Sequence, residues 1–188
     1  MSYYSADELH ALGVQCGERV RISKKASLYG IERMRFGSDV RIDDFCVLSA
    51  GEGGIVIGNH IHIAVYSALI GRGKIIIGDF ANISSRVSIY SSSDDYSGEY
   101  MTNPTVPEQY TGVIHADVVI GAHVIIGSGS VILPGVVLGE GCAIGALSLV
   151  RHDCDEFEIY VGVPAVRKSA RKRALLDRAR EFLANKKS

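Results

Sequence analysis

Hydrophobic residues recur every six positions between Ile120 and Val150. Each six-residue unit opens with an aliphatic residue, often followed by glycine, and a small residue stands four places later. These small residues are Val124, Ser130, Val136, Cys142 and Ser148. A short, fixed period of this kind predicts a stacked β-helix, in which each unit supplies one short strand and one corner. We expect the opening side chains to fill a narrow prism, with only small side chains fitting at the fifth position.

The same pattern extends toward the N-terminus. Units that begin with a large apolar residue and glycine open at Phe36, Ile57, Ile77, Ile120 and Leu138. Three units make one triangular coil, so coils should begin 18 residues apart, as the last two starts do. The first two intervals are 21 and 20 residues, which leaves room for bulges, and the third is 43. With a weaker first coil at Cys16, we predict about six coils and one long excursion at residues 94–116.

Helical patterns flank the repeat. Ser5 and Glu8 form a capping box, and Gly13 ends a short helix. Residues 168–184 follow a helical period whose apolar side consists of Leu175, Leu176, Ala179, Phe182 and Leu183. The chain therefore divides into a helical segment at 1–14, a β-helix at 15–164 and a basic amphipathic helix at 165–188.

Composition narrows the class of protein. The chain is 47% hydrophobic and lacks Trp, which suits a core too thin for large rings. No apolar run approaches the 18 residues of a membrane span, and the first residues lack the basic and apolar regions of a secretion signal. Cys16, Cys46 and Cys142 fall on inward positions, which indicates buried thiols in a reducing cytoplasm rather than a disulfide or zinc framework.

Positive charge is concentrated at the C-terminus. Residues 167–188 hold nine Lys and Arg against two acids, which leaves 11 bases and 19 acids elsewhere. A basic end on an acidic body is typical of a site for an anionic ligand, although a solvated helix face would have the same composition.

The repeat and the closing phrase Tyr160-Val161-Gly162-Val163-Pro164-Ala165 resemble the hexapeptide-repeat acyltransferases over residues 22–166. This resemblance implies a mainly β fold, a single-stranded left-handed parallel β-helix. The chain is most similar to the sugar acetyltransferases, such as galactoside and maltose acetyltransferases. The resemblance implies a cytoplasmic homotrimer that uses acetyl-CoA as cosubstrate, with sites between subunits, no metal and no nucleic acid. It also implies a nucleotide- or lipid-linked sugar of a surface-polysaccharide pathway as the acceptor.

The general base departs from the family pattern. The family's catalytic histidine ends the third unit of a coil just before the excursion, and that position here is Asp94. A carboxylate with a reference pKa near 4 is a weak base unless burial or a like charge raises its pKa, and Asp95 could supply that charge. A turn-forming acidic pair is the alternative. His62 is a second candidate because imidazole titrates near neutrality, although it could be a surface residue or pair with His60.

The acceptor side also differs from the family. Ala64 stands where the family has an acceptor-contacting Asn, so a different sugar is expected. Arg86 cannot point into the prism and could bind an acidic acceptor, orient Asp94 or form a surface ion pair. Tyr90 and Tyr96 lie beside the excursion, where tyrosines commonly contact sugars.

The donor side matches the family better. The resemblance implies backbone contacts to the pantetheine arm at Ser128 and Ala146. Further contacts to the coenzyme are implied at Arg151, His152, Gly162, Val163, Pro164, Arg167, Lys168 and Arg171. The bases in this set suit the CoA phosphates.

The chemistry implied is direct acyl transfer, in which an acceptor amine or hydroxyl attacks the thioester and backbone N–H groups stabilise the oxyanion. An amine would demand less of a base than a hydroxyl, which fits the missing histidine. Two other functions remain open. A non-catalytic trimeric scaffold would share the fold, and so would a metal hydratase similar to the γ-class carbonic anhydrases. The hydratase would need three histidines across an interface, and the spacings of His10, His60, His62, His115, His123 and His152 do not match that pattern.

Overall fold

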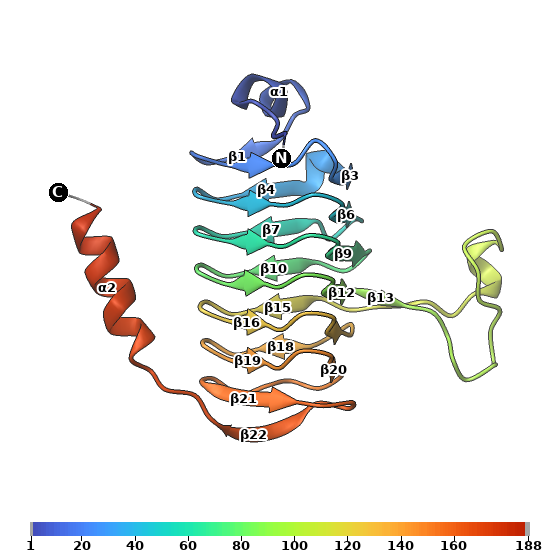
Figure 1. The fold of residues 1–188 in the computed structure, drawn as a ribbon. Helices are drawn as coiled ribbons and strands as arrows, with labels where there is room; N and C mark the ends of the chain where they lie inside the picture. The colour runs from blue at the N-terminus through green and yellow to red at the C-terminus, as the bar shows by residue number, and fades with distance from the viewer. Residues whose placement is uncertain (1, 187–188) are drawn as a thin grey trace.

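The computed structural model describes residues 2–186, which form a three-sided, left-handed parallel β-helix with a helix at each end (Figure 1). In every coil the chain passes along a first, a second and a third face, and the strands of each face stack in parallel register. Seven parallel strands stack on the second face, so the helix has about seven coils rather than the six predicted. The predicted fold class is confirmed.

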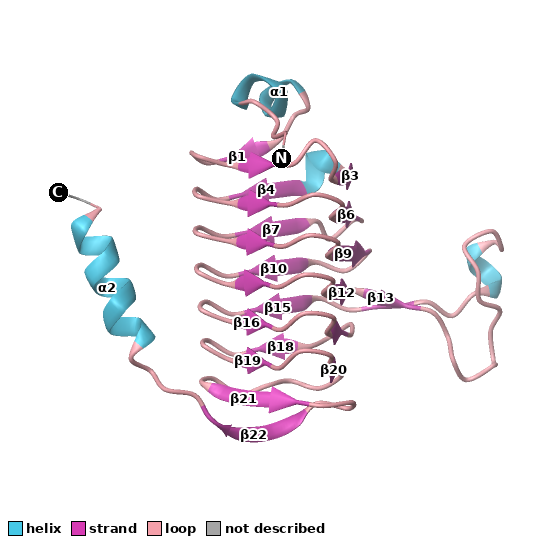
Figure 2. Cartoon of the chain, viewed as in Figure 1, coloured by secondary structure: helices cyan, strands magenta, loops and turns pink. Residues whose placement is uncertain are grey.

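The strands of each face are short, because each corner interrupts the extended backbone (Figure 2). The first face contains β1 (Gln15–Cys16), β4 (Met34–Phe36), β7 (Ile55–Ile57), β10 (Ile75–Ile77), β15 (Val118–Ile120) and β18 (Val137–Leu138). The second contains β2 (Arg21–Ile22), β5 (Arg41–Ile42), β8 (His62–Ile63), β11 (Asn82–Ile83), β16 (Ile125–Ile126), β19 (Ala143–Ile144), β21 (Glu158–Val161) and β22 (Val166–Ala170). The third contains β3 (Ser27–Tyr29), β6 (Val47–Ala50), β9 (Ala68–Gly71), β12 (Ser88–Tyr90), β17 (Val131–Ile132) and β20 (Leu149–Val150).

The core is a column of aliphatic side chains along the axis of the prism. On the second face the inward residues Ile22, Ile42, Ile63, Ile83 and Ile126 are fully buried. The small residues of the repeat are also buried as predicted, because a corner leaves no room for a longer inward side chain. Cys46 and Cys142 are buried, but Cys16 lies exposed in the first coil, so its predicted burial was wrong.

Two of the three corners carry columns of non-glycine residues with positive φ. The first corner, between the first and second faces, includes His60, Phe80 and His123. Their rings stack from coil to coil, with centroid distances of 4.8 Å between His60 and Phe80 and 5.0 Å between Phe80 and His123. The second corner, between the second and third faces, includes Phe45 and Tyr66, which stack at 5.0 Å. Stacking of this kind offsets the cost of a left-handed backbone at a residue with a Cβ.

Helix α1 (Ala6–Ala11) covers the N-terminal end of the prism (Figure 1). The capping box is confirmed: the Glu8 backbone N–H donates to Ser5 Oγ at 3.2 Å, and the Ser5 N–H donates to Glu8 Oε2 at 2.7 Å. Leu9 is 1% exposed and belongs to the main core.

The C-terminal segment differs from the prediction. Residues 166–170 are not helical but form β22, which pairs antiparallel with β21, the last strand of the second face. Helix α2 begins only at Leu175 and ends at Asn185. The predicted helix start at residue 168 was wrong because the apolar period that supports a helix begins at Leu175, whereas the preceding residues pair with the open edge of the last coil.

Helix α2 runs back along the first corner toward the N-terminal coils (Figure 1). Near its start, the Arg171 guanidinium donates to the carbonyl oxygens of His123 and Gly141, each at 2.9 Å. At its far end the Phe182 ring meets His60 edge-on at 5.2 Å, and Lys186 Nζ lies 2.6 Å from Asp39 Oδ2. The first corner is therefore covered by the chain's own helix.

Within residues 2–186, neither helix has the length and apolar character needed to cross a bilayer.

Candidate functional site

The excursion predicted at residues 94–116 leaves the prism at the third corner, between the third and first faces. Its base is an antiparallel pair, β13 (Ser92–Ser93) with β14 (Ile114–His115). Beyond the base the chain makes a projecting loop that includes the 3-10 helix η2 (Glu108–Tyr110) and stands away from the body (Figure 1). We call residues 92–115 the arm.

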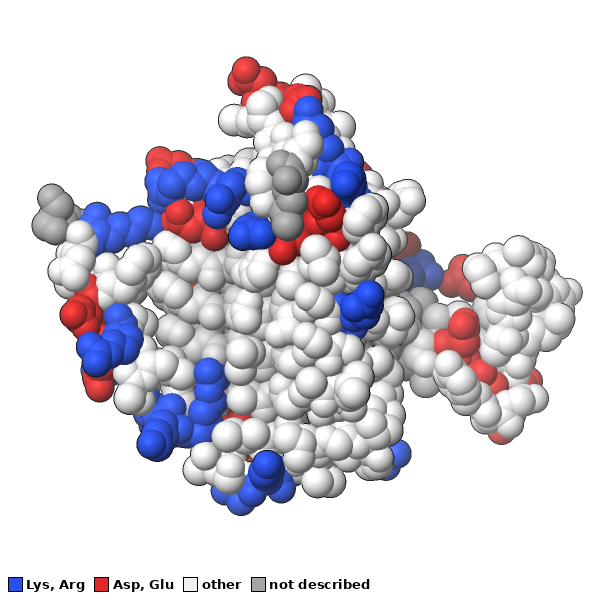
Figure 3. Space-filling model, in the orientation of Figure 1, with Lys and Arg blue, Asp and Glu red and all other residues white. Residues whose placement is uncertain are grey.

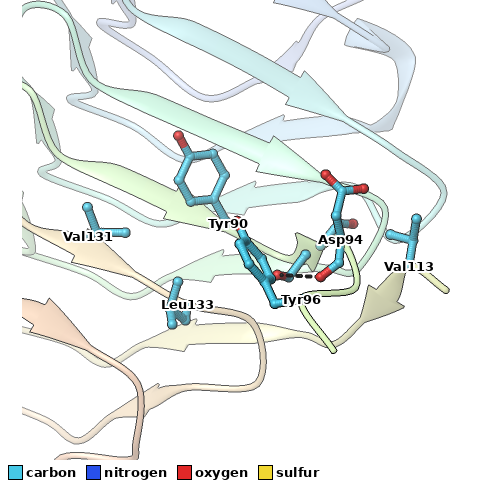
Figure 4. A pocket seen from close by; sticks show the side chains of 8 residues that line it. Tyr90, Asp94, Tyr96, Val113, Val131 and Leu133 are labelled. Carbon is cyan, nitrogen blue, oxygen red and sulfur yellow. Dashed lines mark hydrogen bonds between the residues drawn. The ribbon is translucent and has the colours of Figure 1, made fainter. Parts of the chain in front are cut away.

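A first hollow lies between the base of the arm and the third face (Figure 4). It has a volume of about 430 Å³ and is lined by Tyr90, Ser92, Ser93, Asp94, Tyr96, Val113, Val131 and Leu133. Val131 and Leu133 come from the coil that follows the arm, and they give this hollow an apolar wall. We call it the third-face hollow.

A second hollow lies within the arm itself. It has a volume of about 700 Å³ and is lined by Arg72, Asp94, Asn103, Pro104, Thr105, Val106, Pro107, Glu108, Thr111, Val113 and His115. We call it the arm hollow. Asp94 and Val113 line both hollows, so a molecule in either one lies beside Asp94.

The two predicted acidic residues have different surroundings. Asp95 Oδ1 accepts a hydrogen bond from Ser97 Oγ at 2.8 Å, and Asp95 Oδ2 accepts one from the Gly98 N–H at 2.9 Å. The hydrogen bond from the Ser97 hydroxyl lowers the pKa of the Asp95 carboxyl most, and those from the backbone N–H groups of Ser97, Gly98 and Tyr100 lower it further. Asp95 is thus a turn residue. The Asp94 carboxylate accepts no hydrogen bond from the residues that the structure describes, and only its backbone oxygen is engaged, by Ser93 Oγ at 3.2 Å (Figure 4).

His62 lies on the second face, outside both hollows. Its Nε2 is 2.9 Å from Asp43 Oδ2, and Asp43 also accepts a hydrogen bond from Arg41 Nε at 2.7 Å. His60 stacks in the first corner and is not paired with His62. Within one chain, His62 and Asp94 therefore belong to different sites.

The predicted acceptor residues are only partly brought together. Tyr90 and Tyr96 line the third-face hollow with Asp94, as predicted. Ala64 is 9% exposed and lies outside both hollows. Arg86 belongs to the second corner, where its guanidinium lies 5.2 Å from the Tyr66 ring centroid. Arg86 therefore does not orient Asp94 within one chain. The sequence pattern excluded an inward side chain at Arg86 but could not say which ring it covers.

The predicted donor residues fall on two corners. Ser128, Ala146 and the exposed residues 162–164 follow the second corner, whereas Arg151 and His152 lie at the third. These corners border the two sides of the third face, so one chain presents the donor residues around that face without enclosing a coenzyme.

The basic residues expected at the CoA phosphates already have partners, apart from Lys168, which lies exposed on β22. Arg167 forms an ion pair with Glu158 at 2.9 Å. Arg171 donates to carbonyl oxygens of the first corner, and burial lowers the pKa of its guanidinium.

Several residues of the arm hollow did not emerge from the sequence. His115, Glu108 and Asn103 have no repeat position, and the length of the excursion was the one signal that drew attention to their segment. Among residues 2–186, no three His, Cys, Asp or Glu side chains are grouped so that they could hold a metal ion.

Comparisons with known proteins agree with this architecture. The family described as bacterial transferase hexapeptide (six repeats) matches residues 117–152. A relative from Escherichia coli, dTDP-4-amino-4,6-dideoxy-D-glucose acyltransferase, is 57% identical over 178 residues, covering 94% of this chain and 93% of its own.

Solved structures extend the similarity to nearly the full length. The S84C mutant of AntD, an N-acyltransferase from Bacillus cereus, was crystallised with dTDP-4-amino-4,6-dideoxyglucose and coenzyme A. It superposes with a TM-score of 0.94 at 46% identity, covering 98% of each chain. A maltose O-acetyltransferase from Clostridium difficile, at 22% identity and a TM-score of 0.51 over 89% of this chain and 74% of its own, shares the fold alone. The chain belongs to the hexapeptide-repeat acyltransferases.

Proposed function

We propose that this enzyme transfers an acyl group from acyl-CoA to the amino group of a dTDP-linked 4-amino-4,6-dideoxyglucose. The observation that carries this proposal is Asp94, which lines two hollows at once and whose carboxylate is free of hydrogen bonds from described residues. The name of the Escherichia coli relative and the ligands of the AntD crystal structure support the substrate class. AntD was also crystallised with dTDP and 3-hydroxybutyryl-CoA, so acetyl-CoA is one of at least two donors to test.

The reaction is a direct transfer. The amine nitrogen attacks the thioester carbonyl, a C–N bond forms, and the C–S bond breaks to release the CoA sulfur. Asp94 accepts the single proton that the attacking nitrogen loses and passes it to the departing sulfur, which leaves as the CoA thiol, while backbone N–H groups stabilise the oxyanion. A neutral amine is already nucleophilic, so the weak basicity of a carboxylate is sufficient. A hydroxyl acceptor would need a stronger base, which favours N-acylation over O-acylation.

The AntD structures lend support to this role. They include D94A and D94N variants and S84A, S84C and S84T variants of that enzyme, and this chain has Asp94 and Ser84 at the same numbers. Here Ser84 lies beside the second corner, whereas Asp94 lies at the third. If both serve one site, the serine must come from a neighbouring subunit.

We therefore propose a homotrimer built around the second corner. This corner exposes Phe45, Tyr66 and Leu147, which are 46%, 50% and 72% exposed in the single chain. The first corner is occupied by α2, and the arm leaves from the third. The middle of the face seen in Figure 3 carries few charged residues, while Lys and Arg gather at the first coils and along α2. A threefold assembly on the second corner would bring the second face of one subunit against the third face of the next, beside Asp94.

The activity is tested by incubating dTDP-4-amino-4,6-dideoxyglucose with acetyl-CoA and following both thiol release and the mass of the amide product. Asp94→Asn is expected to lower kcat by about 10²-fold or more, in line with loss of a general base. Asp95→Asn is the matched control and should retain turnover, because Asp95 is engaged in its own turn. If Asp94→Asn kept full activity and His62→Ala were inactive, His62 rather than Asp94 would be the general base. The absence of product with the wild-type enzyme would contradict the proposed function itself.

The proposal also places the enzyme in the cytoplasm, where its four free cysteines would stay reduced.

A further inference from the structure

We propose that the arm of one subunit docks against helix α2 of a neighbouring subunit, so that a second copy of this chain holds the loop that begins beside Asp94. The inference rests on the proposed threefold assembly and goes beyond the proposed reaction. It concerns an interface between protein segments rather than a ligand.

The positions of the corners bring the two segments together. With the second corner on the threefold axis, the third face of one subunit stands opposite the second face of the next. The outer ends of these two faces are the third corner of one subunit and the first corner of the other. Within one chain the arm and α2 stand on opposite sides of the prism (Figure 1). One third of a turn about the second corner therefore carries a neighbour's α2 to the side on which the arm stands.

The two segments also lie at the same height along the prism. The arm follows β12, in the coil that contains Phe80. The Phe182 ring of α2 meets the Phe80 ring edge-on at a centroid distance of 6.2 Å. Because a threefold axis along the prism keeps equivalent coils at one height, Phe182 and Leu183 of a neighbour lie level with the base of the arm.

Both segments expose apolar side chains that a single chain leaves uncovered. Phe182 and Leu183 are 47% and 41% exposed although their helix lies along the first corner. On the arm, the exposed large apolar side chains are those of Tyr96, Tyr100, Met101, Tyr110 and Ile114. Groups of exposed aromatic and aliphatic side chains are typical of a surface that another protein segment covers.

The charges of the two segments are opposite. Residues 92–115 contain four acidic residues and no Lys or Arg, whereas residues 171–186 contain six Lys and Arg against two acidic residues. Figure 3 shows acidic side chains on the arm and basic ones along α2. Two arms would repel each other, while an arm and the C-terminal segment of another copy attract each other. Charge therefore favours α2 of a second copy as the occupant of this surface.

Docking of this kind restrains a loop that stands away from the body in a single chain. The base of the arm carries Asp94, which lines the third-face hollow. A restrained arm keeps Asp94 beside that hollow, so α2 of the neighbour acts as a positioning element for Asp94.

Hydrogen exchange of the arm tests the docking in the assembled enzyme. Leu183→Glu removes apolar surface from α2 and adds a charge that repels the acidic arm. The exchange rates in residues 96–112 should rise by about fivefold or more, because the arm loses a contact that protects it. Ala184→Glu is the matched control, since it adds the same charge to the same helix outside the apolar stripe, and the arm should exchange as in the wild type. Circular dichroism and light scattering check that both variants stay folded and trimeric.

A monomeric chain separates contact with a neighbour from an effect within one chain. In Tyr66→Asp, which is expected to be monomeric, the arm should already exchange rapidly, and adding Leu183→Glu should change nothing further. Unchanged exchange of the arm in trimeric Leu183→Glu would overturn the docking. An equal effect of Ala184→Glu, or an effect of Leu183→Glu that persists in the monomer, would also overturn it.

The outcome is independent of the proposed reaction. A trimer that shows the exchange effect but acylates no dTDP-linked amino sugar would contradict the proposed function and leave the docking standing. An active trimer without the exchange effect would contradict the docking alone.

Discussion

Phe80 has an unusual backbone conformation and an unusual pair of neighbours. Its φ is 61°, in the left-handed region, and its ring lies between His60 and His123 at centroid distances of 4.8 and 5.0 Å. The left-handed conformation costs a residue with a Cβ roughly 1–2 kcal/mol, and the stacked rings offset that cost. Residues of this kind recur at the first and second corners because each coil needs the same turn.

This balance predicts that glycine is a better replacement for Phe80 than alanine. Both substitutions remove the stack, but Phe80→Ala keeps the backbone cost, whereas Phe80→Gly relieves it. The gain is reduced by the greater freedom of glycine in the unfolded chain, so Phe80→Gly should be more stable by about 0.5–1 kcal/mol. The free energy of unfolding from urea titrations measures the difference. Greater stability of Phe80→Ala would show that the corner does not impose the left-handed conformation.

Helix α2 depends on contacts at its two ends, because none of its residues is fully buried. Arg171 fastens the segment before the helix, where its guanidinium donates to three carbonyl oxygens of the first corner, those of His123, Gly141 and Cys142. All three contacts are made by Nη1, at the tip of a side chain that is longer than that of Lys, so a Lys ammonium cannot reach the same carbonyl oxygens with the backbone in place. The position of the helix therefore depends on Arg171 before its start and on Phe182 and Lys186 at its far end.

Arg171→Lys should loosen this attachment and lower the free energy of unfolding by about 1–3 kcal/mol, since carbonyl oxygens at a part-buried site lose their donor. Hydrogen exchange should become faster in residues 175–185. Arg180→Lys on the same helix is the control, because Arg180 forms only an exposed ion pair with Asp177. Unchanged protection of the helix in Arg171→Lys would place the attachment at Phe182 and Lys186 instead.

At the scale of elements, the features that follow from the six-residue period were predicted correctly. The period specifies which side chains point inward, so the core and the β-helix could be derived from it. It does not specify which strand pairs with the last coil, and β22 was missed for that reason. The coil that was missed is the last one, which contributes β21 to the second face but only an isolated bridge between Leu138 and Cys154 to the first, where no aliphatic residue followed by glycine marks its start. Arg86 shows the same limit, since its partner Tyr66 is 20 positions away in the preceding coil.

The candidate site was predictable only where the excursion interrupts the period. Asp94 marks the interruption, and its neighbours Tyr90 and Tyr96 share its hollow. The arm hollow depends on how residues 103–115 fold back over Arg72, which no local pattern encodes. The donor residues could be placed on two corners, but a single chain does not enclose them.

The whole molecule explains this incomplete site if three chains share it. The second corner then carries the assembly, since its stack of Phe45 and Tyr66 is large, apolar and exposed. Tyr66→Asp is the sharpest test, because aspartate tolerates the left-handed φ of 63° at this position, while three carboxylates near the axis would repel one another. The variant should elute as a folded monomer at a mass of 20.2 kDa, against three times that mass for the wild type.

Val137→Asp is the matched control for the Tyr66 variant. Val137 is 42% exposed on the first face, which the proposed interface leaves uncovered, so this variant should remain a trimer. Light scattering after size exclusion measures both masses, and circular dichroism confirms that the β-helix is retained. The monomer should also lose acyl transfer, because the second face of a neighbour would no longer complete the site beside Asp94. A trimeric, active Tyr66→Asp would move the interface away from the second corner, and a folded monomer with full activity would show that one chain contains the whole site.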